Sequence, residues 1–352
     1  MIQCGEPQIG ALEREYVNAV LAGGRLTEGE WCRRFAESLE AVVGSHCIPV
    51  SSGTAALHLA LLAVGVQPGD EVIVPALTYV ATANAVLMCR AKPVVADVDE
   101  KTWTISEHSV SMRLSRRTRA IMPVHLYGVP APSMHDIVCG VYRRTGRRVA
   151  VVEDCAEALG VVPTGDAAAW SFYGSKTITT GEGGAVSCSD PLVYERAWHL
   201  AHQGQTSRRY EHDTLAWNYR MTELQAALGV AQMERLDEFL ARREQVFAWY
   251  DARLAGRFTR QQCSGRHCYW AYAILVPGRL DAVAAAMLAA GVETRPVFLP
   301  VHHHRHLAPH GTYCETASRI SASGLVLPTH CGLTEQDVDT VCKELFRATD
   351  TA

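Results

Sequence analysis

The stretch SFYGSKTITTGEGGAVS, residues 171–187, places a single lysine between two short apolar runs. The runs AAWSFYG (168–174) and GGAVSCS (183–189) have the small and apolar composition of buried strands, so they predict two strands flanking a turn. Lys176 stands on that turn, among hydroxyl residues and glycines. It is either a surface lysine or a desolvated amine that can form a Schiff base, and the rest of the chain has to distinguish the two.

Outward from this stretch, short runs rich in Val and Ile alternate with helical segments. The predicted strands are 46–51, 71–75, 92–98, 119–127 and 147–154, and the predicted helices are 54–65, 79–90 and 131–146. Such alternation is typical of a mostly parallel sheet with helices on both faces. The first part of the chain is therefore predicted to be a large α/β domain.

The second part of the chain predicts a smaller domain. Apolar residues at three- and four-residue spacing predict one long helix from Met221 to about Leu254. The elements predicted beyond it are a strand at 268–277, a helix at 281–291, a strand at 292–298 and a closing helix at 334–348. The expected organisation is a large α/β domain with an N-terminal arm (1–220), a long connecting helix (221–255) and a small α+β domain (256–352).

Composition and charge exclude several classes of function. The net charge of −4 gives no electrostatic case for nucleic acid binding. The N-terminus has no basic segment followed by an apolar run, and the longest apolar stretch, at 55–66, is too short to cross a bilayer. The twelve cysteines are scattered without a CxxC pair, so they are interpreted as reduced thiols. We expect a cytoplasmic enzyme that contacts neither nucleic acid nor membrane.

The histidine-rich run VHHHRH contains His302, His303, His304 and His306. Histidine ligands of a metal usually recur at helical or strand spacing and have a carboxylate or cysteine partner. Adjacent histidines cannot all face one ion. We therefore expect no metal at this run.

A candidate phosphate site follows the first predicted strand, where PVSSGTAALHL places Ser51, Ser52, Gly53 and Thr54 before a helix. Free backbone N–H groups at a helix N-terminus, with glycine allowing close approach, form a cradle for a phosphate. The alternative is that Ser52 or Thr54 only caps the helix. Neither a GxxxxGK[ST] nor a GxGxxG motif occurs here, so a single small phosphate is the better hypothesis.

Two adjacent acidic residues, Glu153 and Asp154, end the predicted strand at 147–154. Asp154 and Glu157 have the D-x-x-E spacing of a helix capping box. In the other interpretation, Asp154 lies at the carboxyl edge of a parallel sheet, where ligands of open α/β folds bind. There its carboxylate could keep a heterocyclic nitrogen protonated.

Together, these features match the requirements of pyridoxal 5'-phosphate (PLP). A phosphate cradle follows an early strand, Asp154 ends a later one, and Lys176 comes some twenty residues further on. PLP needs a lysine for its aldehyde, an acid for its pyridinium nitrogen and donors for its phosphate. The combination favours a PLP enzyme over a surface lysine.

At this point the chain resembles the DegT/DnrJ/StrS family of sugar aminotransferases, whose fold is that of the fold-type-I aminotransferases. The resemblance runs in order through almost the whole chain. It rests on SSGTAALHLAL, PGDEVIVPALTYVATANAV, AKPVVADVD, IMPVHLYG, VVEDCAEALG, WSFYGSKTITTGEGGAV, NYRMTELQAALGVAQMERLDEF, VETRPVFLPVH and GLVLPTHCGLT. The related 3-dehydratases of keto-sugars have histidine where this chain has Lys176, so transamination is expected.

The resemblance implies roles for individual residues. Lys176 would form the Schiff base and Asp154 would pair with the pyridinium nitrogen. The other residues implied to bind the cofactor are Gly53, Thr54 and Ser171 at the phosphate, Tyr79 stacked on the ring, and Glu157. Asn218, in WNYRM, matches a residue that family members donate to the cofactor phosphate of the partner subunit. A homodimer with a shared active site is therefore expected.

The resemblance also suggests a substrate. GSKTITTGEGG and EDCAEA look most like the GDP-perosamine synthase branch, which aminates C4 of GDP-4-keto-6-deoxymannose. Glu157 supports this branch, since many other members have Gln or His there, and Arg295 and His302 are further candidates for binding the sugar or its diphosphate. The expected reaction is ping-pong, with L-glutamate as donor and 2-oxoglutarate as its product.

Other interpretations stay open, and the chain departs from the family pattern at two places. A 3-keto sugar or a keto-cyclitol is an alternative acceptor, and a non-catalytic regulatory protein is a distant one, although such a protein would be expected to lose Lys176 or Asp154. The connection VVPTGDAAA (161–169) is shorter than in the family, and Val129 replaces a mostly polar position. Both changes bear on the choice of acceptor.

Overall fold

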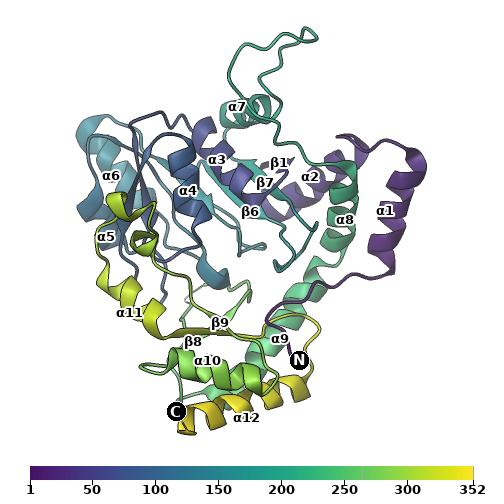
Figure 1. The fold of residues 1–352 in the computed structure, drawn as a ribbon. Coiled ribbons are helices and arrows are strands. Elements are labelled where there is room, and N and C mark those ends of the chain that lie inside the picture. Colours follow the sequence, from purple (N-terminus) through teal and green to yellow (C-terminus); the bar gives the residue numbers. More distant parts are fainter. Residues whose placement is uncertain (264, 352) are drawn as a thin grey trace.

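The computed structural model of the chain describes residues 1–263 and 265–351 (Figure 1). Ser264 and Ala352, both within the predicted small domain, lie outside the described residues. A seven-stranded sheet has the order β1-β7-β6-β5-β4-β2-β3. Its strands are β1 (His46–Val50), β2 (Glu71–Pro75), β3 (Lys92–Ala96), β4 (Thr118–Ile121), β5 (Ala150–Asp154), β6 (Ala167–Ser171) and β7 (Gly184–Cys188).

The direction of the strands confirms a mostly parallel sheet. β3, β2, β4, β5 and β6 pair in parallel, whereas β7 runs antiparallel to both β6 and β1. The two strands predicted around Lys176 are therefore direct neighbours, with Trp170 opposite Ala185. The turn that carries Lys176 leaves the carboxyl end of β6.

Helices cover both faces of this sheet, as the apolar runs predict. Side chains that alternate along β2 separate into two cores: Val72 and Val74 pack with α3 and α4, and Ile73 packs with α5 and α6. The helices of this part are α3 (Gly53–Ala63), α4 (Ala81–Met88), α5 (Glu107–Arg113), α6 (His135–Thr145) and α7 (Pro191–Ala201). Burial on two faces explains why the strands are almost continuously apolar.

Two N-terminal helices add to the predicted N-terminal arm. They are α1 (Ala11–Gly23) and α2 (Glu30–Val43). Gly24 and Gly44 end these helices in the left-handed conformation, with φ of 73° at each. Both helices pack against α8, at the right of Figure 1. The arm is thus a structured cover for one face of the large domain.

The small C-terminal part has its own antiparallel sheet and core. Its strands are β8 (Tyr272–Leu275), β9 (Arg295–Pro296) and β10 (Gly324–Leu327), in the order β8-β10-β9. Its helices are α10 (Leu280–Ala289), α11 (Glu315–Ser323) and α12 (Glu335–Thr351). A separate apolar cluster joins α9, α10, α12 and this sheet. The domain bounds themselves remain a prediction.

The segment predicted as one helix from Met221 to Leu254 consists of two helices. They are α8 (Glu223–Glu234) and α9 (Leu236–Leu254), separated at Arg235, whose φ of −108° and ψ of 8° are not helical. The Arg235 guanidinium pairs with the buried Glu13 at 2.9 Å and lies over Phe239. The change of direction lets α8 pack on α1 and α2 while α9 packs on α12. Periodicity alone cannot show such a break, because both helices keep the same spacing.

The cysteine side chains and the most apolar helices correspond to two further predictions. All twelve cysteines are free thiols, and nine of them are buried, as expected for small apolar core residues. Within residues 1–263 and 265–351, none of the helices combines the length and apolar character needed to cross a bilayer.

Candidate active site

Four of the predicted site residues meet at the carboxyl edge of the large sheet. Asp154 ends β5, Ser171 ends β6, Gly53 begins α3 directly after β1, and Lys176 follows β6 on its turn. Parallel strands bring their carboxyl ends to one edge, and the N-terminus of α3 points there as well. The fold therefore assembles these residues although up to 123 positions separate them in the chain.

The N-terminus of α3 is shaped to accept a phosphate. A Cβ on Gly53 would lie 2.7 Å from Cβ of Ser171, and a Cβ on Gly184 would lie 2.7 Å from the Gly53 nitrogen. Ser52 does cap the helix, because its Oγ accepts from Ala55 N at 3.1 Å. Within the described chain, the backbone N–H groups of Gly53 and Thr54 have no hydrogen-bond partner. The cap and the cradle thus coexist, and a phosphate fits the free donors.

Asp154 is buried and held by two hydrogen bonds. Its Oδ2 accepts from Oγ1 of Thr82 at 2.7 Å, and its Oδ1 accepts from the backbone N of Ala156 at 3.1 Å. Burial raises the pKa of its carboxyl, and the Thr82 hydrogen bond acts in the opposite direction. The capping-box interpretation is wrong, because a turn rather than a helix follows Asp154.

Glu157 and Lys176 form an ion pair in which Glu157 is buried and Lys176 is partly buried. Lys176 Nζ lies 3.2 Å from Oε1 of Glu157, and Oε2 of Glu157 accepts from the backbone N of Tyr127 at 2.8 Å. The Lys176 side chain is 14% exposed, so it is not a solvated lysine on a surface turn. Burial raises the pKa of Glu157, and the nearby Lys176 charge opposes that rise.

Three aromatic residues complete the surroundings of Lys176, and sequence reasoning assigned them no role. The Trp270 ring lies 4.3 Å from Lys176 Nζ, and its Nε1 donates to the Ser175 carbonyl at 3.0 Å. Tyr127 stacks on Trp270 at 5.9 Å, and its hydroxyl accepts from Phe298 N. Trp270 and Phe298 come from the C-terminal part of the chain, so no local motif joins them to Lys176.

The loop containing Tyr127 has one signal that a sequence could carry. Tyr127 has φ of 57° and Gly128 has φ of 92°. A Cβ on Gly128 would lie 3.0 Å from the backbone nitrogens of Tyr269 and Trp270. Glycine is therefore required for this loop to approach the segment that carries Trp270.

Tyr79 and Asn218 are exposed. Tyr79 precedes α4, is 59% exposed, and its ring centroid lies 5.6 Å from that of Phe298. Asn218 lies where the long loop after α7, which extends from the body at the top of Figure 1, returns toward α8. The Asn218 side chain has no hydrogen-bond partner among the described residues. Both side chains are free to meet another group.

The two remaining substrate candidates lie in different surroundings. Arg295 lines a cavity with Ser175, Trp270 and Phe298, next to the Lys176 turn, and its guanidinium lies 3.2 Å from Glu293. His302 instead bonds to Ser318 at 3.1 Å through Nε2. Across the described ranges, no contact joins His302 to Lys176, Glu157 or Asp154. The structure thus brings Arg295, but not His302, to the aromatic cluster.

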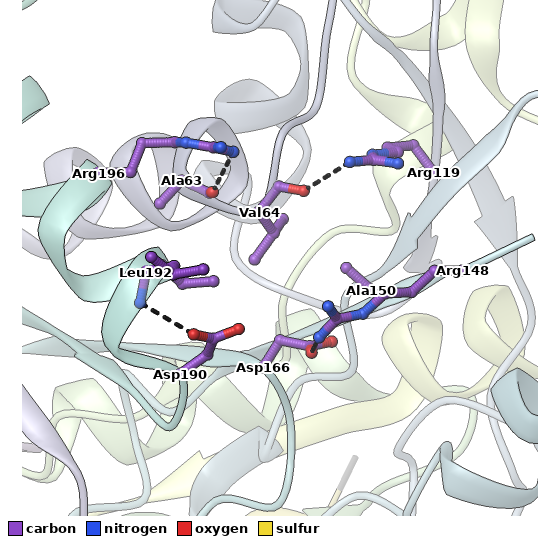
Figure 2. A pocket seen from close by; sticks show the side chains of 10 residues that line it. Ala63, Val64, Arg119, Arg148, Ala150, Asp166, Asp190, Leu192 and Arg196 are labelled. Carbon is purple, nitrogen blue, oxygen red and sulfur yellow. Dashed lines mark hydrogen bonds and ion pairs between the residues drawn. The ribbon is translucent and has the colours of Figure 1, made fainter.

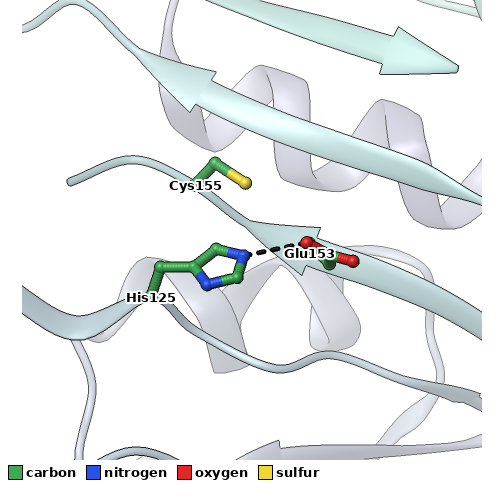
Figure 3. A group of neighbouring side chains, drawn as sticks. All are labelled: His125, Glu153 and Cys155. Atoms are coloured by element: carbon green, nitrogen blue, oxygen red, sulfur yellow. Dashed lines mark hydrogen bonds and ion pairs between the residues drawn. The ribbon is translucent and has the colours of Figure 1, made fainter. Parts of the chain in front are cut away.

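One group of metal-ligating residue types lies beside this site (Figure 3). His125 Nε2 lies 2.9 Å from Oε2 of Glu153, and His125 Nδ1 accepts from the backbone N of Ala131 at 3.0 Å. The other carboxylate oxygen of Glu153 accepts from both N and Oγ1 of Thr164. Burial raises the pKa of the Cys155 thiol, which disfavours a thiolate ligand. These hydrogen bonds make the group a structural clamp on the shortened 161–169 connection.

A second polar pocket lies at the opposite, amino edge of the sheet (Figure 2). Arg119 donates to the carbonyls of Val64 and Gly65, each at 3.1 Å, and Arg196 donates to that of Ala63 at 3.0 Å. These carbonyls end α3, so the two guanidinium groups cap the negative end of that helix. Arg148 pairs with Asp166. This pocket is explained by helix capping.

The fold and the site define a class of protein. The chain belongs to the DegT/DnrJ/EryC1/StrS aminotransferase family, which matches residues 7–346. It is a PLP-dependent aminotransferase, and the free donors at α3, the buried Asp154 and the partly buried Lys176 fit that cofactor. The prediction of fold, enzyme class and cofactor is thereby confirmed.

Particular relatives sharpen the placement within the family. A GDP-perosamine synthase of Caulobacter vibrioides is 40% identical, covering 98% of this chain and 97% of its own. The solved PLP form of the putative sugar aminotransferase Spr1654 from Streptococcus pneumoniae has a TM-score of 0.92 at 25% identity, covering 99% of this chain and 98% of its own. The resemblance to the GDP-perosamine synthase branch is thus supported over nearly the full length.

The relatives do not all bear one substrate in their names. A protein of Acidithiobacillus ferrooxidans named UDP-N-acetyl-3-dehydro-alpha-D-glucosamine 3-aminotransferase is 33% identical, covering 86% of this chain and 84% of its own.

The two segments that depart from the family pattern are both fixed by contacts: Thr164 of the short connection bonds to Glu153, and Val129 is 1% exposed. Val129 is accommodated as an apolar core residue.

Proposed function

We propose that this chain transfers the amino group of L-glutamate to the C4 keto group of GDP-4-keto-6-deoxymannose or a closely similar nucleotide-linked deoxysugar. The observation that carries the proposal is the Lys176–Glu157 pair at 3.2 Å, beside Asp154 and the free donors of α3. The 40% identical GDP-perosamine synthase supports the acceptor. Glu157, the residue that favours this branch, is the one that contacts Lys176.

The residues of the chain divide the work as follows. When bound, PLP supplies an electron sink for the carbanion formed at the amine-bearing carbon. Lys176 would hold the cofactor covalently, and its amine would move the proton at the α-carbon of glutamate. Asp154 would keep the ring nitrogen protonated, while the N–H groups of Gly53 and Thr54 and the Ser171 hydroxyl would hold the phosphate. Tyr79, whose side chain is exposed, would stack on the cofactor ring.

The acceptor site extends from Lys176 toward the C-terminal part of the chain. Glu157 lies nearest the reacting carbon, and Arg295 binds the sugar or its diphosphate at the aromatic cavity. His302 bonds to Ser318 through Nε2, and its buried Nδ1 has no hydrogen-bond partner among the described residues, so Nδ1 is the atom that would contact the same ligand. A guanidinium suits a diphosphate because it offers several donors in a planar fork.

The enzyme acts as a homodimer in the cytoplasm. Asn218 reaches the cofactor phosphate of the partner subunit, which suits an exposed side chain near the base of an extended loop. Residues 1–220 form the cofactor domain, 221–255 the helical connection, and 256–352 the small domain that supplies Trp270 and Arg295. The apolar cluster that joins α9, α10, α12 and the small sheet supports this division, while other residues of 256–352, such as Val301, Leu307 and Ile320, pack into the core of the large domain.

A second acceptor is favoured by one observation. The Acidithiobacillus ferrooxidans relative is named a 3-aminotransferase of a 3-dehydro UDP-sugar, and this name supports a 3-keto sugar as the alternative acceptor. A keto-cyclitol would use the same cofactor residues. A non-catalytic regulatory role is disfavoured, because Lys176 and Asp154 are both present, with Asp154 buried and Lys176 partly buried.

The test is spectroscopic and begins with the purified protein in its PLP form. Addition of L-glutamate is expected to bleach the yellow band and release one 2-oxoglutarate per site. GDP-4-keto-6-deoxymannose, a UDP-linked 3-keto sugar and a keto-cyclitol are then supplied to the bleached enzyme, and recovery of the band is followed. Recovery with the GDP sugar alone supports the proposal. Recovery of the band only with another compound would identify that compound as the acceptor. If L-glutamate does not bleach the band, L-glutamate is not the amino donor.

A further inference from the structure

A chain of buried hydroxyl groups leads from the start of α4 to Asp154. Thr82 Oγ1 donates to Asp154 Oδ2 at 2.7 Å, and Thr78 Oγ1 lies 2.8 Å from Thr82 Oγ1. Thr78 and Thr82 are 1% and 0% exposed. Neither threonine is used by the reaction as proposed above, and neither is explained by packing alone, since a buried hydroxyl needs a partner.

The direction of the hydrogen bonds follows from the charge of Asp154. An ionised carboxylate only accepts hydrogen bonds, so the single hydroxyl proton of Thr82 must be donated to Oδ2 of Asp154. The bond between the threonines is then donated by Thr78. If Asp154 were protonated, it could donate to Thr82 and the whole chain could reverse. When Thr78 donates to Thr82 and Thr82 donates to Asp154, the hydroxyl chain stabilises the ionised form of Asp154.

The other groups around Asp154 cannot replace this hydrogen bond. Among the described residues, Lys176 favours the ionised carboxylate through its charge, and His125, Glu157 and Cys155 are the other titratable neighbours. Ala156 N donates to Oδ1 only. Thr82 is therefore the one side chain that donates to Asp154 within residues 1–263 and 265–351. Burial raises the pKa of Asp154, so losing this donor favours the protonated acid.

Thr82 also connects Asp154 to the residue expected to cover the cofactor ring. The backbone N of Thr82 donates to the carbonyl of Tyr79 at 3.2 Å, within the turn that begins α4. One short segment therefore places both Tyr79 and the hydroxyl that holds Asp154. A bulkier or apolar residue at position 82 would disturb the acid rather than the phosphate cradle.

We propose that Thr82 is a positioning residue for the aminotransferase reaction: its hydroxyl, oriented by Thr78, holds the Asp154 carboxylate ionised and in place for the protonated ring nitrogen of PLP. The inference rests on the proposed role of Asp154. It concerns the affinity for the cofactor, which can be measured without any amino donor or acceptor.

The experiment compares two ligands on the cofactor-free full-length chain. Dissociation constants for PLP and for its analogue with carbon in place of the ring nitrogen are measured by tryptophan fluorescence between pH 5 and about 8.5, a window chosen to span the ordinary carboxyl and histidine ranges. In Thr82→Val, the preference of the native chain for PLP over the analogue should fall about ten- to hundredfold, the order expected for one hydrogen bond to a charged group. The acid limb of the PLP affinity profile should move to higher pH.

Matched variants isolate the hydroxyl. Thr82→Ser keeps the donor and should restore both the preference and the pH profile. Thr78→Val removes only the second hydroxyl and should give a smaller shift in the same direction, which keeps the test available if Thr82→Val does not fold. Thr104→Val changes a buried threonine whose hydroxyl bonds to Thr102 at 2.9 Å, and it should leave both ligands unaffected.

Three contrary results overturn the proposal in different ways. If Asp154→Asn abolishes the preference for PLP while Thr82→Val and Thr78→Val retain it, Asp154 acts as proposed and Thr82 does not. If Thr82→Val weakens the binding of PLP and of the analogue equally, the role of Thr82 is limited to packing. If Asp154→Asn leaves the preference unchanged, the role of Asp154 itself is wrong, and the inference about Thr82 falls with it.

Discussion

The two edges of the large sheet carry polar clusters of similar composition but of opposite character. At the amino edge, Arg119 and Arg196 are spent on the carbonyls that end α3. At the carboxyl edge, the N–H groups that begin the same helix have no partner in the described chain, and the same edge carries the buried Asp154 and Glu157 and the partly buried Lys176. One helix thus has a satisfied end and an open end. Charge alone does not distinguish a site from a cap; the distinction lies in which donors remain free.

The largest effect is expected at the open end, from Lys176→Ala. Without the amine, no group of the chain can hold the cofactor covalently or move the proton at the donor carbon, so turnover should fall at least about a thousandfold. Single-turnover absorbance with L-glutamate measures the loss. Lys176→Arg keeps a cation near Glu157 and Trp270 without a nucleophilic amine, and it should be as inactive while folding normally. Near-native turnover in either variant would contradict the assignment.

Asp154→Asn should have opposite effects on activity and stability. Turnover should fall about a hundredfold or more, because the ring nitrogen loses its anionic partner. The cofactor-free protein should melt at a higher temperature than the native chain near neutral pH. The pKa of Asp154 is raised in the folded state by burial, so its contribution to stability is present below the unfolded pKa and is lost as pH rises through the folded one. Asparagine mimics the protonated form at every pH.

The stability part of that prediction has its own check. Melting curves of the cofactor-free native and Asp154→Asn chains should converge as pH falls below the ordinary range of an aspartate. A lower melting temperature for Asp154→Asn at neutral pH would show that the carboxylate is held more favourably than its burial suggests. The carboxylate at the carboxyl edge would then be stabilised by its own hydrogen bonds, as the helix carbonyls at the amino edge are.

The smallest effect on activity is expected at the satisfied end. Arg119→Ala leaves the last carbonyls of α3 without their donor and should lower the free energy of unfolding by about 1–3 kcal/mol. The rate with L-glutamate should be unchanged, because α3 begins at the other edge. Denaturant unfolding and single-turnover rates are measured on the same samples. Arg116→Ala, an exposed neighbour whose side chain has no partner among the described residues, is the control and should change neither quantity. A lost rate in Arg119→Ala alone would show that the two ends of α3 are coupled.

The group of His125, Glu153 and Cys155 in Figure 3 illustrates which parts of the site could be predicted from the sequence. Asp154 could be assigned to a sheet edge from its position after an apolar run, but its D-x-x-E spacing with Glu157 also suggested a helix cap. Glu153, one residue earlier, carries no motif, yet it bonds to His125 and to Thr164 of the shortened connection. Neighbouring residues of one strand face opposite sides, so the chemistry of Asp154 and the structural role of Glu153 separate only in three dimensions.

The sequence by itself determined what depends on local pattern and on order along the chain. Alternating apolar runs specify a parallel sheet, a glycine at a helix start permits a phosphate to approach, and the order of Gly53, Asp154 and Lys176 matches the needs of PLP. The resemblance to the aminotransferase family rested on the same ordered segments. These features hold wherever the elements finally lie.

Only the tertiary structure decided which distant groups share the site. Trp270 lies 4.3 Å from Lys176 Nζ, Thr82 bonds to Asp154 across 72 positions, and the helix predicted at 221–254 breaks at Arg235 so that its halves pack on different cores. A hydrogen bond or a ring contact forms over a few ångströms, whereas a sequence records neither distance nor direction. The partners of Lys176 and Asp154 were therefore set by packing between elements that no local pattern connects.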